Sequence, residues 1–305
     1  MLRLIPYLIS IFAWCSFPGW AQANLNVVTT TSDSAAIVQM IGGEHVQVQS
    51  LTLGTRDPHF AEATPSMIRR VHQADLLVLI GADLEIGWLP PLLEAARNSR
   101  VLLGARGYVD LSTSVLLLDK PTGTVSRAQG DVHANGNPHY WLDPRNGLRM
   151  AQMISVRLGE IDPTHAADYR ARLEAFQQEL ERRLPVWQAS LASLKGKPVL
   201  AYHKSFVYLA DAFGFQIVAE VEPKPGIPPN ASHLQQLIAT IHTRKISALI
   251  MEPYYERRSA EYLAQQTGVK VVVLPQSVGA QPGIATYFEL FGAVIAAFKT
   301  AGVVP

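Results

Sequence analysis

The sequence of 305 residues contains one cysteine, Cys15, which excludes a disulfide framework and a cysteine-rich zinc site. It also lacks an excess of either charge. Lys and Arg number 26 and Asp and Glu 25, which gives no support for a nucleic-acid-binding protein. Beyond the N-terminal segment, no apolar run is long enough to span a bilayer. Hydrophobic residues make up 48% and charged residues 17%, a composition typical of a folded, core-rich protein. Any site chemistry must therefore come from histidine, carboxylate, amide and hydroxyl groups.

The first 23 residues have the pattern of a secretory signal peptide. Arg3 provides the short positive region, residues 4–19 are apolar, and Ala21-Gln22-Ala23 supplies a small-x-small cleavage site. The alternative is a membrane anchor that stays on the chain, but the apolar segment is short and two prolines interrupt it. We expect cleavage before Asn24, which removes Cys15, and a mature protein in a bacterial periplasm.

Strand-like and helix-like segments alternate along both halves of the mature sequence, which predicts an α/β fold with parallel sheets. Strands are expected at residues 25–31, 45–52, 76–80, 101–103, 199–202, 216–220, 246–251 and 269–274. Helices are expected at residues 65–72, 85–97, 205–213, 232–244, 256–267 and 284–300. Residues 107–138 break this alternation, because they are rich in Gly, Ser, Thr, Asp and Asn, and we expect a functional or mobile loop there.

The longest helical pattern lies between the two halves. Asp162 can cap its N-terminus, Pro163 suits the first helical position, and apolar residues then recur every three or four positions up to Leu194. A helix of about 34 residues would be about 50 Å long, enough to cross a domain. Pro185 should kink this helix or end its regular part. We therefore predict two parallel-sheet α/β lobes, residues 24–160 and 197–305, joined by one long helix at residues 161–196.

Three of the nine histidines stand at the end of a strand or loop, directly before a helix. These are His59, His139 and His203. Ligands bind at this edge of open α/β sheets, and a proline restrains the chain before the first two histidines. Imidazole is a common zinc ligand, and three protein ligands define most of a tetrahedral site. Spacing alone leaves two interpretations open, a shared metal site or three separate structural roles.

The surrounding motifs resemble those of the zinc- and manganese-binding solute-binding proteins of bacterial ABC metal-uptake transporters. Residues 57–65 resemble that family's D-P-H-x-x-E-x-x-P, and residues 137–144 resemble its N-P-H-x-W-x-D-P. Residues 203–206 resemble its histidine in a strand-to-helix turn, and Met251-Glu252-Pro253 resembles its E-P turn. The resemblance covers residues 25–298, and the long helix lies at the matching place.

The resemblance implies a receptor and not an enzyme. His59, His139 and His203 would hold Zn²⁺ as transported cargo in the cleft between the lobes, with Mn²⁺ as the less favoured ion. The protein would deliver the ion to an ABC transporter permease in the inner membrane, and a metallochaperone could load it. We expect a monomer that binds no nucleic acid. Glu62 and Asp143, which belong to the motifs, would either hold ligand histidines or cap helices.

The resemblance also implies a fourth ligand, commonly Asp, in the turn after the last strand. Here Gln276 occupies the acidic position in Leu274-Pro275-Gln276-Ser277-Val278-Gly279. Without a carboxylate ligand the site should favour zinc over manganese, which prefers oxygen ligands. Gln276 is the first choice for the fourth position, followed by a water molecule, and His133 and Glu252 are the other two candidates.

Three alternative functions remain open. The first is a manganese or iron receptor on the same scaffold. The second is a secreted zinc-dependent hydrolase in which Glu252 is the base, although no H-E-x-x-H, G-x-S-x-G or phosphate-cradling motif is present. The third is a surface adhesin that contains a structural metal.

Overall fold

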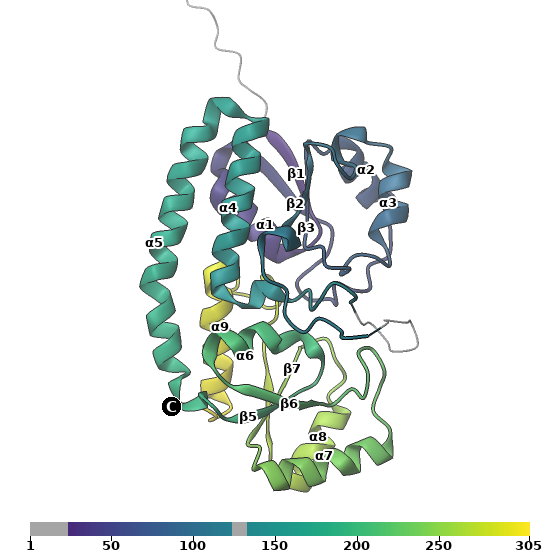
Figure 1. Cartoon of the computed structure of the whole chain (residues 1–305), viewed down its shortest axis with the longest axis vertical. Coiled ribbons are helices and arrows are strands. Elements are labelled where there is room, and N and C mark those ends of the chain that lie inside the picture. Colours follow the sequence, from purple (N-terminus) through teal and green to yellow (C-terminus); the bar gives the residue numbers. More distant parts are fainter. Residues whose placement is uncertain (1–23, 124–132) are drawn as a thin grey trace, which may run out of the picture.

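A computed structural model describes residues 24–123 and 133–305, so the predicted signal peptide lies outside the described residues. In the part of the chain that the structure describes, no helix combines the length and apolarity needed to span a membrane. The chain forms two lobes, each built on a four-stranded parallel sheet, and a long helix runs beside both (Figure 1). This arrangement confirms the predicted architecture.

The sheet of the first lobe has the strand order β2-β1-β3-β4. Its strands are β1 (Leu25–Thr29), β2 (Val46–Ser50), β3 (Leu76–Leu79) and β4 (Tyr108–Asp110), and each neighbouring pair is parallel. Alternate residues of β3 enter two apolar clusters on opposite faces. One cluster includes residues of α1 (Ser32–Gly42) and α4 (Pro144–Ile161), and the other includes residues of α2 (Pro65–Gln73) and α3 (Leu89–Ala96). The central strand is therefore buried on both faces, which explains its continuous apolar sequence.

Two sequence predictions in this lobe are wrong. Residues 101–103 form no strand, because only Val101 is buried, at the end of a 3₁₀ turn, while Leu102 and Leu103 are 41% and 84% exposed. The fourth strand is β4, inside the stretch for which the composition predicts a loop. It contains one buried apolar residue, Val109, so it carried no strand pattern.

Residues 144–161 form the 18-residue helix α4, an element that is absent from the sequence prediction. The signals for this helix are present in the sequence. Asp143 is the N-cap, a proline follows at the first helical position, and Met150, Ile154 and Leu158 are buried at four-residue spacing.

The long helix α5 (Ala166–Ser190) lies along both lobes, on the left of Figure 1. It packs against α1 and α4 of the first lobe and against α9 (Tyr287–Thr300) of the second. Its buried residues are members of the predicted apolar stripe: Tyr169, Phe176, Leu180 and Trp187. Pro185 does not end the helix, which continues to Ser190.

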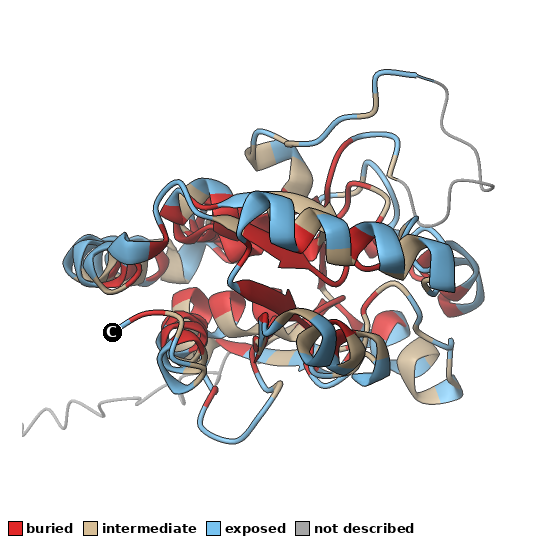
Figure 2. Cartoon of the chain, turned by 90° about the horizontal axis from the view of Figure 1, so that it is seen from below, coloured by how far each residue is buried: buried red, intermediate tan, exposed pale blue. Residues whose placement is uncertain are grey.

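The sheet of the second lobe has the order β6-β5-β7-β8 and is also parallel. Its strands are β5 (Pro198–Ala201), β6 (Gln216–Glu220), β7 (Ala248–Met251) and β8 (Lys270–Val273). Residues of α7 (Ala231–Arg244) and α8 (Arg258–Thr267) pack on one face, and residues of α6 (Val207–Phe213) and α9 pack on the other. Figure 2 shows buried residues on the strands and on those sides of the helices that face the sheets.

One apolar cluster is shared by the two lobes. It includes Val27 and Val78 of the first sheet, Phe176 of α5, and Ala201 and Ile250 of the second sheet. Because close-packed side chains resist rearrangement, a core that is continuous across the lobes limits how far the lobes can move relative to each other.

Candidate metal centre

His59 lies in the loop between β2 and α2, and Asp57 fixes its ring. The Oδ1 of Asp57 accepts a hydrogen bond from the backbone N–H of His59 at 3.0 Å and from its ring Nδ1 at 2.7 Å. The indole of Trp88 donates to the carbonyl of Pro58 at 3.1 Å, which anchors the loop to the first lobe. Since Nδ1 carries the donated proton, Nε2 of His59 has its lone pair free.

His139 is held in the same manner by an amide. It stands directly before the 3₁₀ turn η5 (Tyr140–Leu142) that leads into α4, and it is 1% exposed. The Oδ1 of Asn137 accepts from the backbone N–H of His139 at 3.0 Å and from its Nδ1 at 2.9 Å. The Nε2 of His139 is buried and has no hydrogen-bond partner in the described structure.

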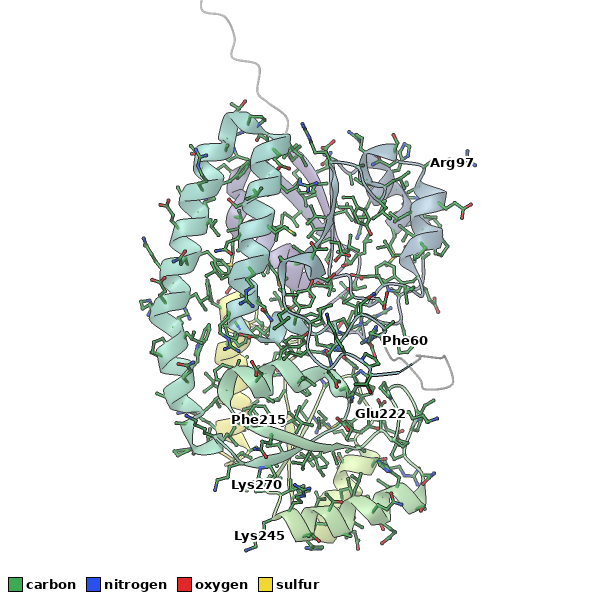
Figure 3. All side chains as sticks on the ribbon, in the orientation of Figure 1. Phe60, Arg97, Phe215, Glu222, Lys245 and Lys270 are labelled. Carbon is green, nitrogen blue, oxygen red and sulfur yellow. The ribbon has the colours of Figure 1, made fainter. Side chains whose placement is uncertain are left out.

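His203 lies just after β5, before a 3₁₀ turn, and comes from the second lobe. Its Nδ1 lies 2.7 Å from Oε2 of Glu222, which also accepts from the backbone N–H of Gly226 at 2.9 Å. His203 and Glu222 are both buried. Glu222, together with Phe60 beside His59, lies at the boundary between the two lobes (Figure 3).

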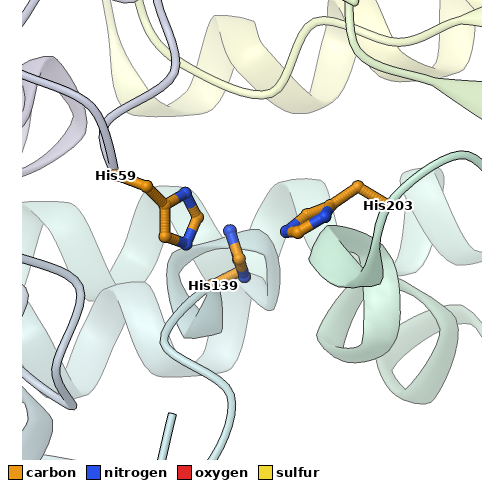
Figure 4. A group of neighbouring side chains, drawn as sticks. All are labelled: His59, His139 and His203. Atoms are coloured by element: carbon orange, nitrogen blue, oxygen red, sulfur yellow. The ribbon is translucent and has the colours of Figure 1, made fainter. Parts of the chain in front are cut away.

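The three predicted histidines converge on one point (Figure 4). One ring nitrogen from each lies within 4.8 Å of the corresponding nitrogens of the other two. The ring centroid of His59 is 5.1 Å from that of His139 and 5.6 Å from that of His203. The centroids of His139 and His203 are 5.7 Å apart. Each Nδ1 is occupied by an oxygen acceptor, so each Nε2 is available at the centre. This is the arrangement of metal-binding histidines, whose second nitrogen donates to a carboxylate or carbonyl-type oxygen.

The electrostatics of the cluster suit a cation. Burial lowers the pKa of His139 well below its usual value, and the neighbouring His59 and His203 lower it further, so this ring stays neutral. Burial also lowers the pKa of His203, but the hydrogen bond with Glu222 and the nearby carboxylates outweigh it and raise that pKa above its usual value. Burial raises the pKa of Asp57, yet the hydrogen bond from His59 and the charge of that ring bring it below its usual value. The carboxylates around the rings therefore favour positive charge at the centre.

Gln276 is buried in the loop after β8, and its side chain is engaged elsewhere. Its Oε1 accepts a short hydrogen bond from the hydroxyl of Tyr254, and its backbone carbonyl accepts from the indole of Trp141 at 2.9 Å. No hydrogen bond joins its amide to the three histidines in the described structure, so its role as a ligand stays a prediction.

Glu252 follows β7 and is fully buried. Burial raises its pKa to about 7, against the opposing charge of His203. Among the described residues, the only group of three or more metal-binding side chains within reach of one ion is that of the three histidines, so Glu252 lies outside it.

His133 lies beside His59. The two Nε2 atoms are 3.2 Å apart, and the ring centroids are 5.2 Å apart. His133, His139 and His203 line one cavity of about 180 Å³, with Asp119 and Lys204 at its side. The ammonium of Lys204 is 2.9 Å from the carboxylate of Asp119. This cavity therefore borders two of the three converging histidines.

The residues that hold the ligand rings were not identified from the sequence. Asp57 and Asn137 could have been, since Asx side chains often bond the backbone two residues further on, and each stands two residues before a histidine. Glu222 is 19 residues from His203, and no sequence signal joins them. Of the two acidic residues expected to hold ligands or cap helices, Asp143 caps α4 through a 2.8 Å bond from the N–H of Arg145, whereas Glu62 is exposed.

The chain is similar to known proteins over most of its length. The family described as zinc-uptake complex component A, periplasmic (ZnuA), matches residues 27–301. A metal ABC transporter substrate-binding lipoprotein of Streptococcus mutans, SloC, is 26% identical over 87% of this chain and 84% of its own length. The zinc-binding lipoprotein AdcA of Streptococcus pneumoniae is 24% identical over 85% of this chain, which spans only 51% of AdcA. A crystal structure of ZnuA covers 92% of this chain and 98% of its own, with 25% identity and a TM-score of 0.73.

Proposed function

Because this chain belongs to the family of periplasmic zinc-uptake components, we propose that it is the metal receptor of an ABC transporter and that its cargo is Zn²⁺. The observation that supports this proposal most directly is the convergence of His59, His139 and His203 with every Nδ1 occupied. The receptor binds the ion between its lobes and delivers it to a permease in the inner membrane.

The donor set favours zinc as the cargo. Imidazole suits zinc, whereas manganese prefers carboxylate, carbonyl and water oxygens. The carboxylates near the centre, Asp57 and Glu222, bond to ring nitrogens and so act on the metal through the imidazoles. A competition titration in which manganese binds as tightly as zinc would contradict this preference.

The signal-peptide pattern and the family support an extracytoplasmic location. We propose that the mature protein begins at Asn24 and is a periplasmic monomer. Mass spectrometry of the exported protein gives the position of cleavage, and light scattering gives its mass in solution. A lipid-modified N-terminus on the exported protein would contradict release into the periplasm.

The protein acts by binding and release without catalytic turnover. A hydrolase on the same residues would use Glu252 as a base toward a zinc-bound water. Assay of the zinc-loaded protein on a p-nitrophenyl ester tests this alternative. Hydrolysis that disappears in the Glu252→Gln variant would overturn the receptor assignment.

A calorimetric zinc titration of the metal-stripped mature protein tests the proposed site. We expect one tight site in the parent protein. In the His139→Ala variant we expect a loss of affinity greater than the roughly 10- to 100-fold that is typical when an outer hydrogen-bond partner is removed. His242, which is exposed on α7, provides the matched control, and His242→Ala should bind zinc like the parent. Equal affinity in the parent and His139→Ala would refute the three-histidine site.

A further inference from the structure

The contact between His59 and His133 does not fit two neutral rings without a cation. His59 uses its Nδ1–H to donate to Asp57, so its Nε2 is an acceptor. The ring of His133 is hydrogen-bonded to the backbone of Asp83, whose carbonyl accepts from the ring N–H. Because Nε2 of His133 faces His59, we assign this bond to its Nδ1, which makes its Nε2 an acceptor as well. Two lone pairs then face each other at 3.2 Å.

A zinc ion between these two nitrogens would remove the repulsion. Two nitrogens that bind one tetrahedral Zn²⁺ at the usual Zn–N length are about 3.3–3.4 Å apart. The observed 3.2 Å agrees with that separation.

A strained turn positions His133. Gly81, Ala82 and Asp83 at the end of β3 have consecutive positive φ angles of 73°, 51° and 67°. Left-handed backbone at a non-glycine residue persists only where the surroundings enforce it. The carboxylate of Glu85 accepts from the backbone N–H groups of Ile80 and Gly81 at 2.9 and 3.0 Å, which holds the turn.

The turn meets the His133 segment at two points. The backbone of Asp83 bonds the ring of His133, and the Oδ2 of Asp83 accepts from the side chain of Asn135 at 3.1 Å. The position of His133 is therefore fixed from the first lobe, on the cavity side of His59.

We propose that His133 is the fourth ligand of the cargo zinc, in the position that the sequence analysis gave first to Gln276. This inference rests on the proposed function. The amide oxygen of Gln276 already accepts a hydrogen bond from Tyr254. By contrast, Nε2 of His133 carries no proton and faces the metal-binding nitrogen of His59. His133 stands outside the group of three nitrogens that lie within 4.8 Å, so the four rings draw together by small movements when the ion binds.

Zinc competition titrations and x-ray absorption at the zinc edge test this assignment on the mature protein. The variants are His133→Ala, Gln276→Ala and, as control, His242→Ala. We expect four imidazoles around zinc in the parent and three in His133→Ala, with affinity lowered at least about tenfold, the smaller loss typical of an outer-partner change. Gln276→Ala and the control should keep four imidazoles and the parent affinity. Thermal unfolding of each metal-free variant checks that it is folded.

The possible outcomes separate this inference from the proposed function. Tight zinc binding in the parent that is lost in His139→Ala, with no change in His133→Ala, overturns the inference and leaves the receptor intact. Weaker binding in His133→Ala with an unchanged imidazole count also overturns it, because His133 would then act without touching the metal. A parent that fails to bind zinc refutes both.

Discussion

The side-chain amide of Asn137 donates a 2.6 Å hydrogen bond to the backbone carbonyl of Lys204. Lys204 follows His203, and the oxygen of the same amide accepts from His139. One side chain thus connects the ligand segment of the first lobe with that of the second. The amide orientation is fixed by its partners, since the ring of His139 needs an acceptor and the carbonyl of Lys204 needs a donor.

Replacement of Asn137 separates these two functions. Asn137→Asp keeps the acceptor for His139 but loses the donor to Lys204 and places a carboxylate against that carbonyl. Asn137→Ala loses all three hydrogen bonds of the side chain. We expect zinc affinity to fall by about 10- to 100-fold in the alanine variant and by less in the aspartate variant, measured by chelator competition. Equal affinity in all three proteins would show that the amide does not position His139.

Zinc affinity should fall in acid, and the ligand rings should be protonated in a definite order. A histidine must be neutral to bind zinc, so protons compete with the metal. The pKa of His203 is raised by its carboxylate neighbours, whereas that of His139 lies well below its usual value. As the pH falls, His203 is therefore protonated before His139. Between pH 8 and 6, about the range around the usual histidine pKa, log affinity should fall with falling pH with a slope of at least about one proton. An affinity that stays constant over this range would contradict this assignment.

Stability should respond to pH through Asp33, the buried carboxyl at the start of α1. Burial raises its pKa to about 7, although it accepts from the N–H of Val278 at 2.9 Å. A carboxyl whose pKa is raised on folding holds its proton more tightly in the folded chain. The folded state therefore loses stability as the pH rises from about 4 to about 7.

Asp33→Asn keeps an acceptor for Val278 and removes the charge. We expect the free energy of unfolding of the metal-free variant to exceed that of the parent by roughly 1–3 kcal/mol at pH 8, with a smaller difference at pH 5. Urea denaturation of both proteins at the two pH values measures this. A variant that is less stable than the parent at pH 8 would mean that the charged carboxylate is the stabilising form.

The two lobes should unfold together. Phe288 of α9 packs against Phe176 and Trp187 of α5, with ring centroids 4.7 and 6.3 Å apart, inside the core that both lobes share. Phe288→Ala should lower the free energy of unfolding by about 3–5 kcal/mol. It should also lower the midpoint temperature of a single calorimetric transition. Two separate transitions in the parent, of which the substitution shifts only one, would show that the lobes are independent.

The sequence predicted the architecture well because its signals are local. The alternation of apolar runs and helical stripes repeats in both halves, and the stripe of α5 is buried as expected. The wrong predictions have a common cause, because tertiary packing determines whether a short segment forms a strand. Leu102 and Leu103 form an apolar pair that stays exposed, while β4 is a strand because it extends the sheet beside β3.

In the candidate site, too, local motifs are predictable from the sequence and long-range contacts are not. His59, His139 and His203 were identified because each lies in a compact motif. Their partner Glu222 and the turn at Asp83 are brought to the site only by the folded chain, through residues far apart in the sequence. The proximity of His133 to His59 joins positions 74 residues apart, and no spacing rule predicts such a contact.

His59 and His139 come from the first lobe and His203 from the second, so a bound ion would connect the two lobes. Metal–nitrogen distances in metal sites stay within about 0.2 Å of their usual values. Any partner that pulls His203 away from the other two rings by a few tenths of an ångström would do mechanical work directly against the metal bonds. Unloading of the cargo then requires very little displacement, which suits a molecule whose two lobes share one core.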